Sequence, residues 1–444
     1  MAERQKMSAN PRRICVGITE TYSYDNDGLL TGSGAYTLTR DVQNGYVTQL
    51  TDGTLTQYRS YNGYGELTEL SDNTFTYQLT ERDNSGAITQ KKEIINGITV
   101  TYDYTYDDMG RLIEVKKDGS ITEAYTYDNN GNRLSATVNG VSTIASYTLD
   151  DQLEVYGDNS YRYDDDGYLV EKITPDGTTT YDYGTMGELR EVNTPSQTIT
   201  YQHNALNQRT AKLINGQVVE KYLWADLTTL LAIYDANDNL VQRFEYADQR
   251  MPVSMTTVDN TKYYLHYDQV GSLRAVSDTS GNIVKEVVYD TFGNIVSDSD
   301  EEFYVPFGFA GGLYDPDTKL TRFGYRDYDS FTGKWTAKDP IGFEGGDSNL
   351  YGYVLGDPVN FVDPEGLLEK NIFDKAWDLF FGESASDMRK KAFCVTCKGL
   401  IDKGLSDTDA CGIAGQPISL CNADRGCYID YSTWVAKGCT ETCK

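Results

Sequence analysis

The chain has 444 residues, of which 39% are apolar and 12% aromatic, with 36 Tyr, 41 Gly and a formal net charge of −28. Such an acidic chain repels nucleic acid and anionic membranes, and no run of 18 apolar residues is present that could span a bilayer. Because Tyr favours strands and Gly supplies turns, the composition predicts an all-β fold.

Residues 1–20 form a leader to which we assign no role. The start of the chain is basic, but its apolar run extends only over Ile14–Ile18 and contains Gly17. This run is shorter than the apolar region of a secretory signal peptide. Any export is therefore expected to use another route or a partner.

A repeated motif, aromatic-x-Tyr-Asp-x-x-Gly-x-Leu, runs through residues 21–262. Clear copies are Tyr22–Leu30, Tyr104–Leu112, Tyr125–Leu134 and Tyr161–Leu169. The turn glycines Gly45, Gly65, Gly86, Gly110 and Gly131 are 20, 21, 24 and 21 residues apart. A period in this range is typical of a repeat architecture.

Each repeat has the chemistry of a β-hairpin. Tyr-x-Tyr places two rings on one face of a strand, and Asp-x-x-Gly turns the chain because Asp caps the turn and Gly adopts the left-handed conformation. A single hairpin is unstable alone, so successive hairpins are predicted to stack side by side in a continuous sheet. The tyrosines are expected to pack in that sheet, and nothing specific favours the alternative of a sugar-binding platform.

The array resembles the RHS/YD-repeat family, and the likeness covers most of residues 20–367. Tyr263–Asp278 (YYLHYDQVGSLRAVSD) looks like the signature that begins the family's core-associated region. Phe309–Trp335, followed by Asp339–Leu367, is similar to the C-terminal core pattern of the family. We therefore treat residues 263–367 as an RHS core-associated region with a self-cleavage motif.

This resemblance implies a spiral of stacked β-hairpins that forms a hollow shell, or part of one, around the core-associated region. It also implies a carrier similar to the C components of insecticidal toxin complexes, in which the C-terminal piece is a toxin held inside the shell. Such proteins cut their own chain after the Gly-Leu that closes the core. In this chain the cut is expected between Leu367 and Leu368.

By the same resemblance, the cut is made by Asp339 and Asp363 with help from Arg326. Two neighbouring carboxylates share a proton, so that one acts as a base on water while the other, protonated, polarises the scissile carbonyl. Arg326 would anchor a carboxylate or stabilise the oxyanion. The expected activity is a single-turnover aspartyl autoprotease that needs no cofactor.

Spacing alone leaves a structural role for these aspartates open, because Asp-Pro commonly starts turns and also occurs at Asp315 and Asp357. Ser330 and Asp327 stand where the family commonly has Pro and an aromatic residue. Neither is next to the proposed pair in sequence. We assign no role to the two histidines, His203 and His266.

The composition changes sharply in residues 368–444, which we interpret as a variable effector domain. This segment has 10 Lys and Arg against 11 Asp and Glu, no His, and seven of the eight cysteines of the chain. Without His it cannot contain a His-dependent nuclease or a Cys-His nucleophile. Apolar spacing in Glu369–Phe381 predicts one helix, and a capping box at Ser384 predicts a second one that extends through the CxxC pair.

The tail cysteines are expected to form disulfides in an oxidising compartment. Alternatives are a Cys-only zinc site and a reactive thiol. The candidate residues are Cys394, Cys397, Cys411, Cys421, Cys427, Cys439 and Cys443.

The main hypothesis is a secreted or surface-located RHS-type carrier that releases its own C-terminal domain. Its expected partners are that domain as cargo, a shell-completing or secretion partner, and a cognate immunity protein. The rival hypothesis is a YD-repeat surface protein that binds or adheres without cleavage. A third is an orphan fragment, because the chain provides only about 17 hairpins at roughly 20 residues each.

Overall fold

The computed structural model describes residues 12–15 and 18–367, together with four two-residue strands near the C-terminus. These are β34 (Cys421–Asn422), β35 (Gly426–Cys427), β36 (Asp430–Tyr431) and β37 (Trp434–Val435), which pair antiparallel as β34 with β35 and β36 with β37. Cys421 and Cys427 are cross-strand partners. Both predicted tail helices and the other five tail cysteines lie outside the described residues, so disulfides and zinc remain predictions.

The chain divides into two compact units. The larger contains residues 12–202 and 209–370, and the smaller groups residues 203–208 with residues 1–11 and 371–444. Within the described residues the larger unit is almost entirely β, as the composition predicted, and its helices are short 3-10 turns. None of the described helices has the length and hydropathy needed to cross a membrane.

The wall of the larger unit consists of strands β1 to β29, which belong to one sheet. In chain order they are β1 (Arg12–Cys15), β2 (Ile18–Tyr24), β3 (Leu30–Ser33), β4 (Tyr36–Arg40), β5 (Val47–Thr51), β6 (Thr56–Tyr61), β7 (Leu67–Ser71), β8 (Phe75–Arg82), β9 (Ile88–Ile95), β10 (Ile98–Tyr106), β11 (Leu112–Lys117), β12 (Ser120–Tyr127), β13 (Arg133–Val138), β14 (Val141–Tyr147), β15 (Leu153–Tyr156), β16 (Asn159–Tyr163), β17 (Leu169–Thr174), β18 (Gly177–Tyr183), β19 (Leu189–Asn193), β20 (Thr198–His203), β21 (Arg209–Ile214), β22 (Gln217–Trp224), β23 (Leu230–Tyr234), β24 (Leu240–Glu245), β25 (Ser254–Thr257), β26 (Lys262–Tyr267), β27 (Leu273–Asp278), β28 (Ile283–Tyr289) and β29 (Ile295–Asp298).

From β1 to β20 and from β21 to β29, consecutive wall strands pair antiparallel, as stacked hairpins require. In the strand pair β12–β13, for example, Tyr125 lies opposite Ala136, and the register then shifts between Thr126 and Tyr127. The same shift occurs before the second Tyr of other repeats, including Tyr106 and Tyr163. A bulge of this kind bends the strand and increases its twist. The predicted hairpins are therefore confirmed, and each carries a local source of curvature.

The Asp-x-x-Gly turn has the predicted chemistry. In the turn after β10, Asp107 Oδ1 accepts hydrogen bonds from the backbone N–H groups of Met109 at 2.9 Å and Arg111 at 3.0 Å. Gly110 has φ of 82°, a conformation that costs other residues energy. Hairpins turn at the opposite edge of the sheet through two-residue Asp-Gly or Asn-Gly turns such as Asp118-Gly119, where both residues also have positive φ.

The second Tyr of a repeat ties its hairpin to the preceding one. The hydroxyl of Tyr127 donates to the carbonyl oxygen of Leu112 at 2.8 Å, and the hydroxyl of Tyr147 donates to that of Arg133 at 2.9 Å. The first Tyr, for example Tyr125, is buried in the hydrophobic core. This confirms that these tyrosines serve sheet packing, and the hydroxyls of Tyr127 and Tyr147 are satisfied by hydrogen bonds across the sheet.

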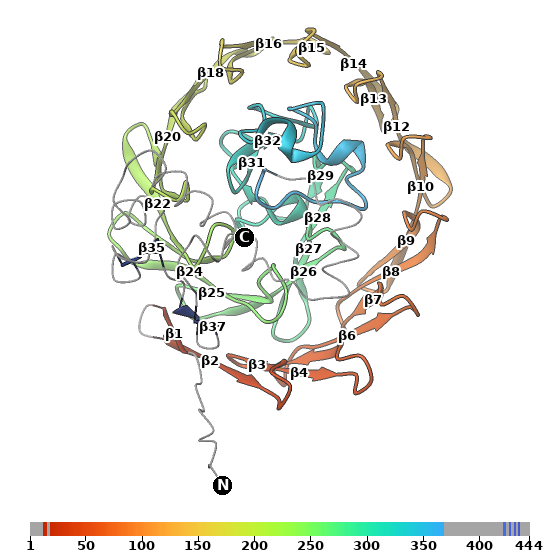
Figure 1. Cartoon of the computed structure of the whole chain (residues 1–444), viewed down its shortest axis with the longest axis vertical. Helices are drawn as coiled ribbons and strands as arrows, with labels where there is room; N and C mark the ends of the chain where they lie inside the picture. Colours follow the sequence, from red (N-terminus) through yellow and green to blue (C-terminus); the bar gives the residue numbers. More distant parts are fainter. Residues whose placement is uncertain are drawn as a thin grey trace. The chain divides into compact units, whose positions relative to one another are not determined.

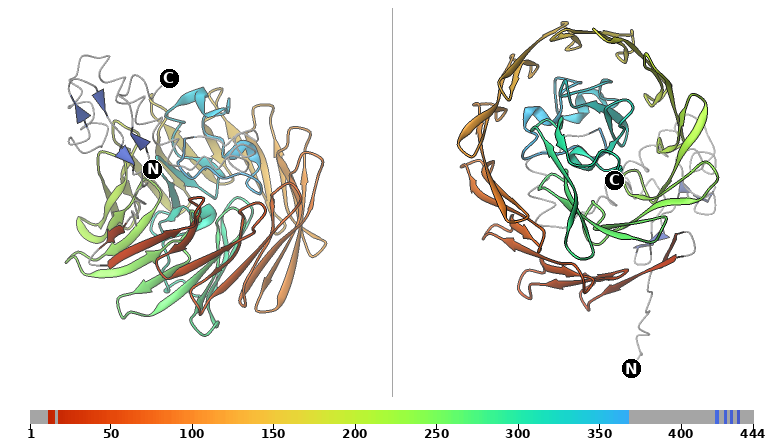
Figure 2. Two further views of the ribbon diagram at one scale, coloured as in Figure 1. Left: turned by 60° about the horizontal axis from the view of Figure 1, so that its bottom comes forward. Right: turned by 180° about the vertical axis from the view of Figure 1, so that it is seen from behind.

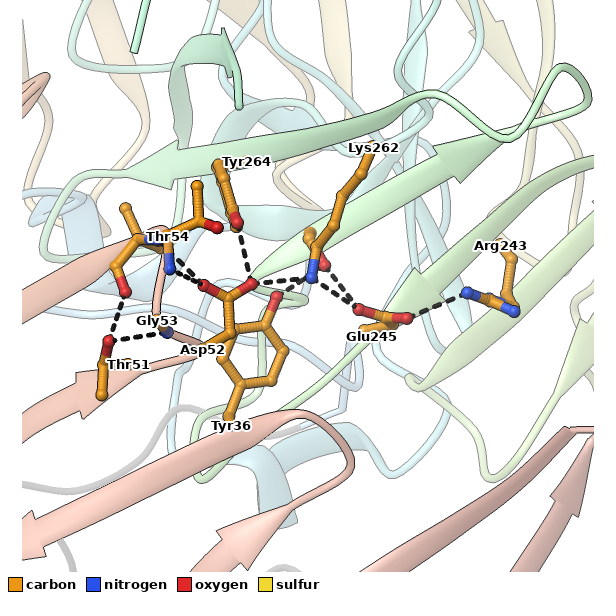
Figure 3. Close-up of polar contacts among 11 residues, drawn as sticks. Tyr36, Thr51, Asp52, Gly53, Thr54, Arg243, Glu245, Lys262 and Tyr264 are labelled. Atoms are coloured by element: carbon orange, nitrogen blue, oxygen red, sulfur yellow. Dashed lines mark hydrogen bonds and ion pairs between the residues drawn. The ribbon is translucent and has the colours of Figure 1, made fainter. Parts of the chain in front are cut away.

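The wall overlaps itself, because strands near its end lie against hairpins near its start. Figure 3 shows one such contact, in which Asp52, in the turn after β5, accepts from Lys262 Nζ and from the hydroxyl of Tyr264 on β26, both at 2.8 Å. Lys262 Nζ also lies 3.1 Å from a carboxylate oxygen of Glu245. Two further contacts follow along the overlap, Arg274 with Glu93 at 2.9 Å and His266 with Asp72 at 3.0 Å. This overlap gives the sheet its spiral path.

Residues 299–367, here called the inner segment, lie inside the arc of the wall (Figures 1 and 2). They form a four-stranded sheet of β30 (Leu313–Tyr314), β31 (Leu320–Phe323), β32 (Arg326–Asp329) and β33 (Lys334–Trp335), with 3-10 turns η1 (Phe309–Gly311), η2 (Gly342–Gly345) and η3 (Val354–Gly356).

Charged side chains of the wall hold the inner segment in place. Lys212 on β21 lies 2.8 Å from Asp315, and Lys172 on β17 lies 3.2 Å from Asp329. Asp327, which departs from the usual family residue, is buried beside Arg209 of the wall at 3.2 Å. The Asp315-Pro316 pair therefore serves to anchor the segment.

The overlap also contains a proton-sensitive contact. Glu123 on β12 accepts from the hydroxyl of Tyr125 at 2.6 Å and from the backbone N–H of Thr291 at 3.1 Å. Burial, reinforced by the nearby carboxyl of Asp290, raises the pKa of Glu123 from 4.5 to about 7. Because the folded-state pKa is the higher one, this contribution to stability is present below about pH 4.5 and is lost as the pH rises through about 7.

We therefore expect Glu123→Gln, which stays neutral, to lose less stability than the wild type between pH 5 and pH 8. Denaturant unfolding of both proteins at the two pH values measures this difference. Equal pH dependence in the two proteins would show that Glu123 is not the group that titrates.

Candidate active site

Arg326 is the first residue of β32, and its side chain is almost completely buried. The guanidinium lies over the ring of Trp335 on the neighbouring strand β33, with its carbon 4.3 Å from the ring centroid. Its Nε donates to the carbonyl oxygen of Gly366 at 2.5 Å, and its Nη1 donates to that of Leu350 at 3.2 Å. These contacts leave one nitrogen, Nη2, for the two aspartates.

The structure brings together the three residues that the sequence singled out. Nη2 of Arg326 lies 2.8 Å from Asp339 Oδ2 and 3.2 Å from Asp363 Oδ2. One nitrogen thus bridges two carboxylates that are 24 residues apart in the chain. All three side chains are nine-tenths or more buried, so the ion pairs act with little screening by solvent.

Backbone contacts fix the orientation of both carboxylates. Asp339 Oδ1 accepts from the N–H of Ile341 at 3.0 Å, and the N–H of Asp339 donates to the carbonyl oxygen of Leu350 at 2.9 Å. Asp363 Oδ1 accepts from the N–H of Leu367 at 3.2 Å. The second aspartate therefore holds the very residue at which the chain is expected to be cut.

Gly345 shows where the carbonyl oxygen of Leu367 lies. A Cβ atom placed on Gly345 would be 3.0 Å from Asp339 Oδ2 and 3.1 Å from the Leu367 oxygen. The carboxylate oxygen and the carbonyl oxygen therefore both border the space beside Gly345. Leu368, on the other side of the expected cut, lies outside the described residues.

Burial shapes the electrostatics of the site. It raises the pKa of Asp339 from 3.8 to about 6, although the cation of Arg326 opposes the rise. Burial also lowers the pKa of Arg326, and the two aspartates limit that decrease. A carboxyl with a pKa near 6 can both hold and release a proton close to neutral pH, which suits a general acid or base.

A pocket lies at these groups, and one acidic residue in it was missed by the sequence interpretation. Arg326, Asp339 and Asp363 line this pocket together with Gly345 and Asp347. Burial raises the pKa of Asp347, and its Oδ1 accepts from the N–H of Asn349 at 2.8 Å. Its position within the Asp339–Leu367 motif was the available signal, but without an adjoining Pro it looked like an ordinary loop residue.

Comparison with known proteins assigns the fold. The sequence model of the family described as Teneurin YD-shell matches residues 10–353. The chain belongs to this Teneurin YD-shell family. The resemblance to RHS/YD-repeat proteins is thereby confirmed. The match ends ten residues before Asp363, so it includes Arg326 and Asp339 but not the second aspartate or Leu367.

Similar proteins are much longer than this YD-shell chain. Mouse teneurin-3 is 30% identical over 325 residues, which cover 69% of this chain and 12% of that protein. The tRNA3(Ser)-specific nuclease WapA of Bacillus spizizenii is 29% identical over 274 residues, covering 60% of this chain and 11% of the nuclease. The matched part of this chain therefore spans about a ninth to an eighth of the length of these relatives.

Among solved structures, the crystal structure of TcdB2-TccC3 has a similar fold. The TM-score is 0.51 at 18% identity, and the match covers 79% of this YD-shell chain and 22% of that chain. At this identity the likeness supports the fold alone.

Replacing Arg326 would leave two buried carboxylates without their common cation. We expect Arg326→Met to destabilise the folded state by about 3–5 kcal/mol, because breaking a buried pair leaves an uncompensated charge. Arg162→Met is the matched control. Its side chain is 67% exposed in an ion pair with Glu171, so its loss should cost less than about 1 kcal/mol. Denaturant unfolding compares the two variants, and equal small losses would contradict the burial of the Arg326 pairs.

Proposed function

We propose that this YD-shell protein is an RHS-type carrier that cleaves its own chain between Leu367 and Leu368 by aspartyl proteolysis. One observation carries the proposal: Asp339, Asp363 and Arg326 meet at a pocket beside the carbonyl oxygen of Leu367. Turns explain the individual aspartates, but they do not explain two buried carboxylates on one guanidinium beside that carbonyl oxygen.

The chemistry follows from these positions. Protonated Asp339 lies on the side of the Leu367 carbonyl oxygen and polarises it, while ionised Asp363 takes a proton from an attacking water. The water oxygen bonds to the Leu367 carbonyl carbon, giving a tetrahedral intermediate whose negative charge Arg326 stabilises. The bond to the Leu368 nitrogen then breaks, and that nitrogen takes up the proton held by Asp363.

Only one turnover is required, because enzyme and substrate are the same chain. The hydrogen bond from the Leu367 N–H to Asp363 holds the peptide in place at 3.2 Å before any reaction. Such pre-positioning removes the entropy cost of bringing reactants together and substitutes for a deep substrate cleft. Products are a carboxylate on Leu367 and a free amine on Leu368.

Cleavage would separate residues 368–444, the proposed effector domain, from the shell. We propose this domain as the cargo, with a shell-completing or secretion partner, a cognate immunity protein and a secreted or surface location. The relative WapA, a tRNA-specific nuclease, supports this proposal, and the solved structure of similar fold carries two component names, TcdB2 and TccC3. The near-neutral tail gives no reason to transfer the nuclease activity to this chain.

An uncleaved shell that acts as a binding or adhesion surface is the alternative. It is favoured by the end of the family match at residue 353, before Asp363 and Leu367. The two functions differ in one measurable property, the state of the Leu367–Leu368 bond.

We expect the purified wild type to run as two fragments on a denaturing gel, and Asp339→Asn and Asp363→Asn to stay intact. Loss of a general acid or base slows such reactions by at least about 10²-fold. Glu344→Gln, an exposed acid in the same motif, is the control and should cleave as the wild type does. Because Asp339 must be protonated, the rate should fall as the pH rises through about 6. An uncleaved wild type would support the adhesion alternative.

Gly345→Ala tests the geometry separately from the proton transfer. The new Cβ would come within 3.0 Å of Asp339 Oδ2 and 3.1 Å of the Leu367 oxygen, so one of them must move. A shift of a few tenths of an ångström relieves contacts of this length, so we expect cleavage to slow several-fold, less than the roughly 10²-fold cost of a displacement of about 1 Å. Gly63→Ala is the control, because its Cβ would meet no atom within 4 Å. Time courses of cleavage in cell-free synthesis measure both, and a normal rate in Gly345→Ala would remove the Leu367 carbonyl from the site.

A further inference from the structure

One turn of the wall contacts two residues of the inner segment that lie next to the proposed cleavage site. Asn132 follows the turn between β12 and β13 and is 1% exposed, while Lys334 on β33 and Asn349 of the inner segment are 4% and 2% exposed. The Nζ of Lys334 donates to Asn132 Oδ1 at 2.5 Å and to Asn349 Oδ1 at 3.2 Å. Asn349 Nδ2 also donates to Asn132 Oδ1, at 2.6 Å. One oxygen of the wall thus receives two donors from the inner segment.

The wall fixes Asn132 from the other side. Its Nδ2 donates to Asp128 Oδ2 at 3.0 Å and to Asp151 Oδ1 at 2.6 Å, so the amide spans two successive turns of the wall. The ring of Tyr147 lies 4.8 Å from Lys334 Nζ. The side chain of Asn132 is therefore held by the wall and is not free to follow the inner segment.

Each of the two partners of Asn132 immediately precedes a residue that contacts Arg326. Asn349 precedes Leu350, whose carbonyl oxygen accepts from the Asp339 N–H at 2.9 Å and from Arg326 Nη1 at 3.2 Å. Lys334 precedes Trp335, on whose ring the Arg326 guanidinium lies at 4.3 Å. A shift of either segment would move the guanidinium that bridges the two carboxylates.

Equivalent asparagines elsewhere in the wall show that this contact goes beyond turn formation. Asn239 and Asn282 occupy the same turn position and donate to Asp235 and Asp278 of their own turns at 2.8 Å and 2.9 Å. Both are exposed, whereas Asn132 is buried. The hydrogen bond from Asn to Asp within the turn therefore forms without burial. The burial of Asn132 comes instead from its contacts with the inner segment.

We propose that Asn132 is a positioning residue of the cleavage site, supplied by the wall, so that the site is complete only after the β12–β13 turn has closed over the inner segment. This inference rests on the proposed self-cleavage. It deepens that proposal, because the cut then occurs only in a chain whose wall has wound around the segment to be cut. Cleavage becomes a consequence of shell assembly.

The test compares cleavage time courses of full-length chains in cell-free synthesis. We expect Asn132→Ala to slow cleavage by about 10²-fold, the cost of a displacement of about 1 Å in the site. Asn132→Asp keeps the oxygen that faces Lys334 and Asn349 but places a carboxylate against Asp128 and Asp151, so it should slow cleavage as well. Asn239→Ala removes the equivalent turn bond without touching the inner segment and should leave the rate unchanged. Thermal unfolding of each variant, with cleavage also blocked by Asp339→Asn, shows whether the shell is intact.

A wild-type rate in Asn132→Ala overturns the inference. If Asn132→Ala unfolds below the assay temperature, Asn349→Ala carries the same prediction, because it releases Leu350 without changing the wall. A wild-type rate in Asn349→Ala would then overturn the inference. An uncleaved wild type is a different result, since it removes the proposed protease itself and not merely the role of Asn132.

Discussion

The structure depends on one constraint: the wall is a single sheet, and its inner face must be covered by another part of the chain. That face carries buried cations as well as rings, among them Arg133, Arg209 and Lys212. Buried charges are tolerated only when they are paired and hydrogen-bonded. The inner segment supplies the partners, and the positions of these partners along the wall dictate how the segment lies.

This constraint accounts for the position of the proposed cleavage site. Ion pairs from Arg209 to Asp327 and from Lys172 to Asp329 hold both ends of β32, the strand that begins with Arg326. Arg326 in turn sets the separation of the two catalytic candidates. The proposed catalytic residues therefore depend on a strand that the wall holds at two positions, and such support favours precise positioning. The same ion pairs explain why a strongly acidic chain can bury many of its carboxylates, because Lys and Arg side chains of the wall pair with them.

Sequence reasoning succeeded where the determinants are local. Tyr spacing and the Asp-x-x-Gly turn specify a hairpin within about 20 residues, so the repeats and their turns were predictable. Arg326, Asp339 and Asp363 were found through the resemblance, and the structure brings them together. The contact between Asn132 and Lys334 joins residues about 200 positions apart, and its existence depends on the accumulated curvature of the sheet. No local sequence pattern predicts a contact between residues so far apart in the chain. The overlap of the wall onto itself could not be predicted for the same reason.

The most direct test of this account is the intact mass of the purified full-length chain. Self-cleavage predicts two species, one ending at a Leu367 carboxylate and one beginning with a free amine on Leu368, whose masses together exceed that of the chain by one water. A single species of 49.7 kDa, or fragments defined by any other bond, would contradict it.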